Sequence, residues 1–198
     1  MVISVWQALL ATLFVLCFGS FAWGMRRFFK QPAGAVPGMK VISFCGLVFS
    51  IIHLVLILSA TSVRPAWRIV AAALYICSLI LFWWALASNR EKPLSAAFSP
   101  DSPSHLVQHG PYRFIRHPFY SSYLLAWTAG VFAAANLWLI PTVLIMLVIY
   151  IRAAKFEEAK FAATSLGTEY SSYKASTGLF VPNPFKRFSG RRTHRAWQ

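Results

Sequence analysis

Three long apolar segments occupy the first half of the chain. They run over residues 2–25, 41–61 and 66–87, and Arg68 is the one charged residue inside them. A helix needs about 20 apolar residues to cross the hydrocarbon core of a bilayer. Several tryptophans lie near the ends of these segments, where amphipathic rings prefer the membrane interface. The pattern therefore predicts three membrane-spanning helices within residues 1–87.

Two shorter apolar segments follow, over residues 119–135 and 137–151, and Asn136 and its neighbours separate them. This spacing predicts a tight helical hairpin. The second helix is expected to continue into water and to end at Gly167, because glycine is a common C-terminal breaker. A short polar helix is expected around residues 168–176. The predicted fold class is all-α: a polytopic integral membrane protein with about five transmembrane helices, including this short helix-four/helix-five hairpin, and a cytoplasmic C-terminal helical extension.

Composition supports the membrane class. Hydrophobic residues make up 58% of the 198-residue chain and charged residues 12%, whereas soluble domains average about 45–50% and about 25%. A soluble fold could not cover so much apolar surface with so few charges. We therefore treat residues 1–198 as a single membrane domain.

The distribution of positive charge predicts the orientation. If the chain crosses the membrane five times, 17 of its 19 Lys and Arg residues lie on one side. Only Arg64 and Arg68 lie on the other side or within a span next to it. An excess of Lys and Arg marks the cytoplasmic face. The N-terminus is thus predicted outside, and the C-terminal region in the cytoplasm. Basic residues of the tail are expected to lie on anionic lipid: Lys186, Arg187, Arg191, Arg192 and Arg195.

The stretch GPYRFIRHPFY, residues 110–120, is unusually polar for such a chain. Pro118 is expected in the first turn of the fourth helix, which places His117 beside the helix N-terminus. That end carries free N–H groups and partial positive charge, and Arg113 and Arg116 add full charges. The stretch suits an anion such as a carboxylate or phosphate. The alternative is a helix cap whose arginines meet lipid headgroups.

Carboxylates are scarce, since the chain has only five, and two of them are adjacent after the last span. Glu157 and Glu158 lie on the same predicted membrane face as GPYRFIRHPFY. A site that combines arginine, histidine and glutamate would match both charges of a zwitterion.

Three stretches carry a family resemblance: SHLVQHGPYRFIRHPFY (104–120), FEE (156–158) and GTEYSSYKASTGLFVP (167–182). Together they resemble the isoprenylcysteine carboxyl methyltransferases, and the related phospholipid N-methyltransferases share much of the pattern. The resemblance covers about the last 95 residues, from Ser104 on. RHPxY with a downstream EE and GxEYxxY is fairly specific in combination.

The resemblance implies an S-adenosylmethionine-dependent integral membrane methyltransferase that acts on a lipophilic acceptor, such as the carboxyl group of an isoprenylcysteine-like substrate. A phospholipid or a small thiol is the alternative acceptor. Residues 1–87 would then hold three N-terminal spans, and residues 88–198 the cofactor-binding methyltransferase core with its tail. The positions that match the family's cofactor-binding residues are Ser104, His105, Leu106, Val107, Tyr112, His117, Pro118, Phe119, Tyr120 and Glu158.

One departure concerns the substrate. Family members place an arginine four residues before the cofactor glutamate, where it is thought to hold the substrate carboxyl group. Ala154 stands at that position here, and the nearest arginine is Arg152. Arg152 is therefore the candidate substrate contact, and no catalytic base is assigned.

Other function classes stay open at this stage. Membrane sterol reductases, which use a nicotinamide cofactor, have a similar C-terminal pattern but show Asn before the motif tyrosine and Gly-Glu after it; Phe119 and Ser121-Ser122 stand here. A nonenzymatic scaffold or transporter is a third class. No metal site is predicted, because each of the three cysteines lies within a span and suits apolar packing. His53, inside the second span, is interpreted as bonded to a neighbouring helix.

The expected partners are a lipophilic or lipid-linked substrate and membrane lipids, and nucleic acid is not expected because no soluble basic domain is present. Short loops suit a prokaryotic inner membrane with the active site on the cytoplasmic face, or the endoplasmic reticulum of a eukaryote.

Overall fold

The structure, a computed structural model, describes residues 3–29, 36–89, 97–98, 103 and 105–183. Its helices are α1 (Val5–Phe28), α2 (Pro37–Ser59), α3 (Pro65–Ala87), α4 (Pro118–Ala134), α5 (Ile140–Ala162) and α6 (Gly167–Ser176), with 3₁₀ turns at Gly110–Arg113 (η1) and Leu137–Leu139 (η2). These described ranges contain no strand, only an isolated bridge between Ile115 and Gly178. The predicted all-α class is confirmed.

Four elements are long and apolar enough to cross a membrane: α1, α2, α3 and the segment Leu137–Ala162 that contains α5. Helix α4, with 17 residues, is the short member of the predicted hairpin. Neighbouring helices bury most side chains of α4, so little of this helix faces lipid. It can therefore be shorter than a helix at the edge of the bundle. Trp67 at the start of α3 packs on Phe132 near the end of α4, with ring centroids 5.4 Å apart. The hairpin therefore extends along the length of α3.

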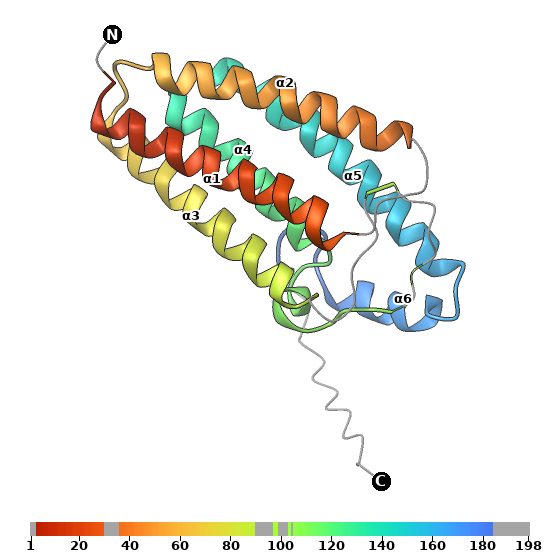
Figure 1. Cartoon of the computed structure of the whole chain (residues 1–198). Helices are drawn as coiled ribbons and strands as arrows, with labels where there is room; N and C mark the ends of the chain where they lie inside the picture. The colour runs from red at the N-terminus through yellow and green to blue at the C-terminus, as the bar shows by residue number, and fades with distance from the viewer. Residues whose placement is uncertain (1–2, 30–35, 90–96, 99–102, 104, 184–198) are drawn as a thin grey trace.

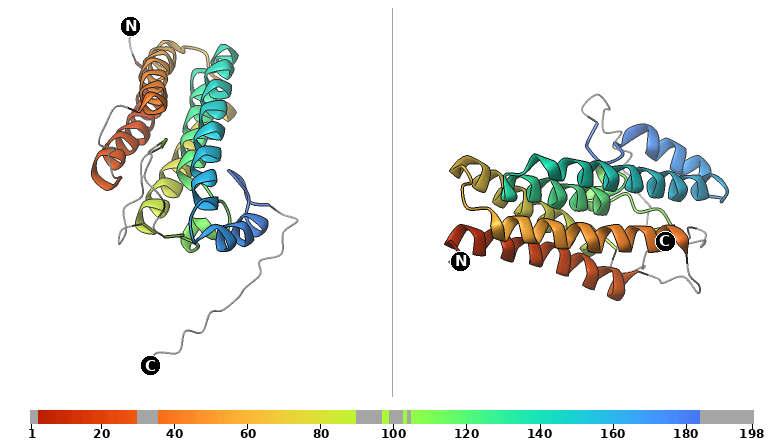
Figure 2. Two further views of the ribbon diagram at one scale, coloured as in Figure 1. Left: turned by 90° about the vertical axis from the view of Figure 1, so that its right-hand side faces the viewer. Right: turned by 90° about the horizontal axis from the view of Figure 1, so that it is seen from above.

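Helices α1 and α2 lie on one side of the bundle and α4 and α5 on the other, with α3 beside α1 and α4 (Figures 1 and 2). At one end, the Gln7 amide donates to the carbonyls of Leu58 and Ala60, which joins α1 to the end of α2. At the opposite end, Phe29 after α1 contacts Phe119 at the start of α4, with ring centroids 5.0 Å apart. The helix ends that precede or follow the basic segments thus gather at one end of the bundle, as the charge pattern predicts.

His53 is fully buried in α2. Its Nε2 atom lies 2.8 Å from Oγ1 of Thr142 on α5, and its ring packs edge-on against Trp127 of α4. The interpretation of a histidine bonded to a neighbouring helix is confirmed. Gly130 of α4 faces the imidazole so closely that a β-carbon there would overlap Nδ1 of His53.

Gly130→Ala is therefore expected to destabilise the bundle by about 1–3 kcal/mol, the usual cost of overpacking a core. The bond from His53 to Thr142 leaves the ring little freedom to move aside. Thermal unfolding in detergent measures the effect. Gly19→Ala on α1 is the control, because no atom lies within 4 Å of the added carbon. An equal fall of the unfolding midpoint in Gly130→Ala and Gly19→Ala would contradict the packing argument.

Helix α5 ends at Ala162, which corrects the expectation that it continues to Gly167. The Thr164 hydroxyl donates to the carbonyl of Phe161 and accepts from the N–H of Leu166. Such side-chain bonds compete with the helical backbone pattern and favour a turn. Gly167 is instead the first residue of α6.

Candidate active site

The motif stretch folds as a turn that leads into a helix. Gly110 begins η1 with a φ of +59°, a left-handed conformation that glycine adopts without strain. Pro118 occupies the first turn of α4, as predicted, and His117 is the residue before it. The His117 side chain makes no capping bond to its own helix, so its ring is available to other groups.

The segment after α6 holds this stretch in place. The backbone N–H groups of Arg116 and His117 donate to the carbonyls of Gly178 and Leu179, over 2.9 and 3.2 Å. The Phe180 ring packs edge-on against the His117 ring, with centroids 6.2 Å apart. Two parts of the chain some 60 residues apart thus form one unit.

Glu158 is the centre of a buried ionic cluster. Its carboxylate accepts from Nε of Arg116 and from Nζ of Lys174, each over 2.7 Å. Nε2 of His117 lies 3.5 Å from the same carboxylate. The Glu158 side chain is only 7% exposed, and Arg116 also donates to the carbonyl of Thr177. The cluster therefore ties α4, α5 and α6 together.

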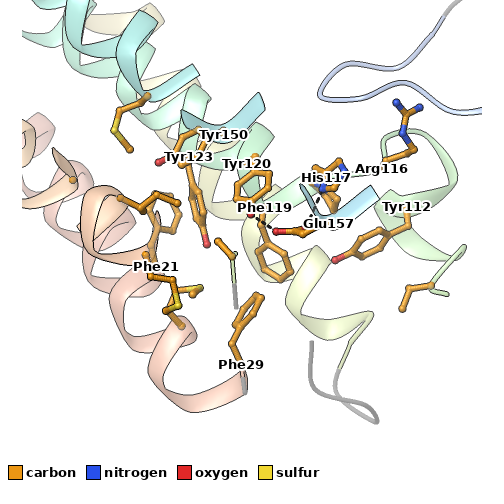
Figure 3. Close-up of a pocket in the computed structure, with 18 of the residues that line it drawn as sticks. Phe21, Phe29, Tyr112, Arg116, His117, Phe119, Tyr120, Tyr123, Tyr150 and Glu157 are labelled. Carbon is orange, nitrogen blue, oxygen red and sulfur yellow. Dashed lines mark hydrogen bonds and ion pairs between the residues drawn. The ribbon is translucent and has the colours of Figure 1, made fainter. Parts of the chain in front are cut away.

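Glu157 points to a different side of α5, because adjacent helical residues are about 100° apart. The Tyr120 hydroxyl donates to its carboxylate over 2.5 Å, and Nδ1 of His117 lies 3.5 Å from it. Figure 3 shows Glu157 between the Tyr120 and His117 side chains. The Tyr120 ring also stacks on the ring of Tyr150 of α5, with an angle of 12° between the two ring planes. His117 is thus placed between two carboxylates with different surroundings.

These carboxylates govern the charge of His117. Burial alone would lower its pKa, but the contacts with Glu157 and Glu158 outweigh burial and raise the pKa above its ordinary value. The charged imidazolium is therefore favoured up to a higher pH than in a free histidine. Burial also raises the pKa of the Tyr112 and Tyr173 phenols, so both remain neutral. The Tyr112 hydroxyl accepts from the Asn89 amide, and the Tyr173 hydroxyl donates to the carbonyl of Tyr112.

A pH effect on stability follows. A raised pKa in the folded state means that the His117 contacts stabilise the fold fully below about pH 6.5, the ordinary value for histidine. This stabilisation is lost as the pH rises through the raised pKa. The unfolding midpoint of wild type is expected to fall over that range relative to His117→Gln, as measured by thermal scans at a series of pH values. A constant difference between the two proteins would contradict this assignment.

The cluster borders a cavity of about 810 Å³, within the roughly 300–1,000 Å³ of ligand pockets. Polar and charged lining residues include His105, Tyr112, Arg116, His117, Glu157 and Lys160. Apolar residues from α1 and α2 and from α4 and α5 line the rest, among them Phe18, Phe21, Met25, Ile42, Leu47, Phe119, Trp127 and Met146. In Figure 3, Phe21 and Phe29 face the aromatic side chains of α4 and α5. One cavity therefore joins an ionic wall to an apolar chamber.

Most residues predicted for the site line this cavity: His105, Leu106, Val107, Tyr112, His117, Pro118, Phe119 and Tyr120. Ser104 lies outside the described residues. Glu158 contacts His117 but is not among the lining residues. The structure does not bring Arg152 to the cavity, because its side chain lies on an exposed face of α5. Ala154 is fully buried and also does not line it.

Several lining residues were not predicted from the sequence, notably Tyr123 and Tyr150, and Glu157 was not distinguished from Glu158. The spacing of Tyr120 and Tyr123 was the available signal, because residues three apart share a helix face. No motif marked the walls that α1 and α2 contribute.

Comparison with known proteins places the chain in a family. The phospholipid methyltransferase family matches residues 66–169, more than half of the chain. The matched region contains α3, α4 and α5 with both site carboxylates. No curated protein matches the chain. The family match favours methyl transfer over the sterol reductase and scaffold alternatives. The chain thus belongs to the phospholipid methyltransferase family and is a multi-pass membrane methyltransferase, related to the isoprenylcysteine enzymes that its C-terminal half resembles.

Proposed function

We propose that this protein transfers a methyl group from S-adenosylmethionine to a lipophilic acceptor held in the apolar chamber. The single observation that carries the proposal is the shared cavity, with His117 and Glu157 on one wall and apolar side chains of α1 and α2 on another. A charged donor and an apolar acceptor need such unlike surroundings side by side. Family membership supports the reaction class, and the family description supports a lipid acceptor.

The residues at the ionic wall fit the cofactor. S-adenosylmethionine carries a carboxylate and an ammonium group. Glu157, which lines the cavity, would accept from the ammonium, and His117 would contribute positive charge for the carboxylate. Nε2 of His117 is buried and lies 3.5 Å from the Glu158 carboxylate, which keeps the ring oriented at the cavity wall. The sequence resemblance assigned the contact to Glu158; we propose that Glu158 instead positions His117 and Arg116.

The bound cofactor supplies an electrophilic methyl group on a sulfonium. The protein's task is then to align the acceptor with that group and to exclude water. Aromatic side chains of α4, such as Tyr123 and Trp127, would form the dry wall. A carboxylate or thiolate acceptor needs no base, whereas a protonated amine must first lose a proton.

We propose that the acceptor reaches the cavity from the bilayer and the cofactor from the cytoplasm. The apolar lining from α1 and α2 supports the first route, and the basic segments at the same end of the bundle support the second. A phospholipid, an isoprenylcysteine carboxylate and a small thiol remain the acceptor classes. The division into spans over 1–87 and a cofactor core over 88–198 stays part of the proposal. This division is supported by the ionic cluster, because all of its residues lie within 88–198.

Calorimetric titration of the purified protein in detergent tests the cofactor. Binding of S-adenosylmethionine and S-adenosylhomocysteine is expected, and binding of a nicotinamide nucleotide is not. Lipid extracts from cells with and without the gene, compared after labelling with methyl-tagged cofactor, test the acceptor. Labelling confined to water-soluble products would refute a lipophilic acceptor. Reporter fusions test the predicted cytoplasmic C-terminus and external N-terminus.

A further inference from the structure

We propose that Arg26 binds an oxyanion of the acceptor's headgroup, a carboxylate or a phosphate, and so selects anionic lipophiles. The inference rests on the proposed function and deepens it, since it names the chemistry that this site recognises in its acceptor. It also assigns a role to the N-terminal half of the chain, which carries no family motif.

Arg26 lies in the last turn of α1 and lines the cavity. Two ring contacts fix the placement of this turn. Phe21 packs on Tyr123 and Phe29 packs on Phe119, with centroids 4.6 and 5.0 Å apart. Arg26 lies between these two phenylalanines in the sequence, so its turn faces the first turns of α4, directly after His117. An acceptor in the apolar chamber would therefore have Arg26 and the ionic wall at the same end.

The charge of Arg26 is not neutralised by any described carboxylate. Arg116 is bound to Glu158 and to a backbone carbonyl, and His117 lies between two glutamates. Lys160 lies over the Phe156 ring, 5.6 Å from its centroid. Arg26, by contrast, forms no ion pair within the described ranges. A guanidinium that borders an apolar cavity suits a carboxylate or phosphate, which it can bind with two parallel hydrogen bonds.

This placement also accounts for the missing arginine of α5. The sequence resemblance implies an arginine for the substrate carboxyl group at the position of Ala154, which is fully buried here. Arg152 is exposed and does not line the cavity. The wall formed by α5 therefore presents no arginine, and Arg26 presents one from the opposite side of the bundle. Residue 26 lies outside the segment that matches the family, so comparison with the family gives no sign of it.

The competing explanation is that Arg26 only meets lipid headgroups at the membrane surface. Arg26 and Arg27 are both exposed in the last turn of α1 and carry the same charge, but only Arg26 lines the cavity, so Arg27 provides the matched control. If the arginines only meet lipid headgroups, Arg26→Gln and Arg27→Gln should behave alike. If Arg26 recognises the acceptor, only Arg26→Gln should change the preference for an anionic acceptor.

The test compares probes that differ only in the anion. Farnesylthioacetate and its carboxamide form one pair, and dodecyl phosphate and dodecanol the other. Their affinities are measured in neutral detergent with S-adenosylhomocysteine bound, for wild type, Arg26→Gln and Arg27→Gln. Wild type and Arg27→Gln are expected to prefer the anion of at least one pair by roughly ten- to a hundredfold. Arg26→Gln is expected to lose that preference and to keep wild-type affinity for S-adenosylhomocysteine.

The pair that shows the preference identifies the source of the oxyanion, a carboxylic acid or a phospholipid. Four results would overturn the proposal: no preference in wild type, an unchanged preference in Arg26→Gln, an equal loss in Arg27→Gln, or a loss of S-adenosylhomocysteine affinity in Arg26→Gln. The last result would assign Arg26 to the cofactor. Failure of all three proteins to bind S-adenosylhomocysteine would instead refute the proposed function, so the two failures are distinguishable.

Discussion

Glu158→Gln is expected to reduce the free energy of unfolding by about 3 kcal/mol, the lower end for breaking a buried ion pair. The neutral amide leaves Arg116, whose side chain is 9% exposed, without a matching charge. It also removes one of the two carboxylates that stabilise charged His117. For a protein of this size the unfolding midpoint should fall by roughly 6–12 °C, measured by thermal scans in detergent.

Two controls separate the buried cluster from general charge effects. Glu169→Gln removes an exposed carboxylate of α6 that accepts from Gln108, and should change stability by less than about 1 kcal/mol. Lys174→Met removes a partner of Glu158 whose side chain is 53% exposed, and an exposed pair contributes only about 0–1 kcal/mol. A Glu158→Gln protein as stable as either control would show that the cluster does not hold α5 and α6 together.

The helices were predictable because a bilayer fixes how long an apolar segment must be. Proline positions added detail, since Pro118 occupies the first turn of α4 as expected. The end of α5 was missed because Thr164 forms side-chain bonds that compete with the helix, and composition does not reveal which threonines do so. Local chemistry of this kind requires the backbone geometry.

The site was predictable only where its residues are contiguous. His117, Phe119 and Tyr120 line the cavity together because one turn and one helix start carry them. Glu157 and Glu158 are adjacent, and their different roles depend on how α5 is rotated against α4 and α6. No periodicity within α5 fixes that rotation. Arg26 could not be assigned either, because its position depends on packing between helices far apart in the sequence.

Glu157→Gln is expected to weaken binding of S-adenosylhomocysteine by roughly ten- to a hundredfold, because a hydrogen bond to a charged group contributes about 1.5–3 kcal/mol. Glu157 lines the cavity and its side chain is 26% exposed, so a ligand ammonium can reach it. Gln keeps an acceptor for the Tyr120 hydroxyl, and water can reach this partly exposed position, so the loss of stability should be smaller than for Glu158→Gln. The predicted signature is a large loss of affinity with a smaller fall of the unfolding midpoint than Glu158→Gln shows.

Calorimetric titration and thermal scans on the same preparations measure both quantities. Arg152→Ala is the control on the same helix, because its exposed side chain lies away from the cavity and cofactor affinity should be unchanged. Tyr120→Phe should lower affinity less than Glu157→Gln, since it removes only the hydroxyl that donates to this carboxylate. Wild-type affinity in a folded Glu157→Gln protein would exclude Glu157 from the cofactor site. If affinity instead fell in a stable Glu158→Gln protein, the direct contact would belong to Glu158, as the family resemblance implies.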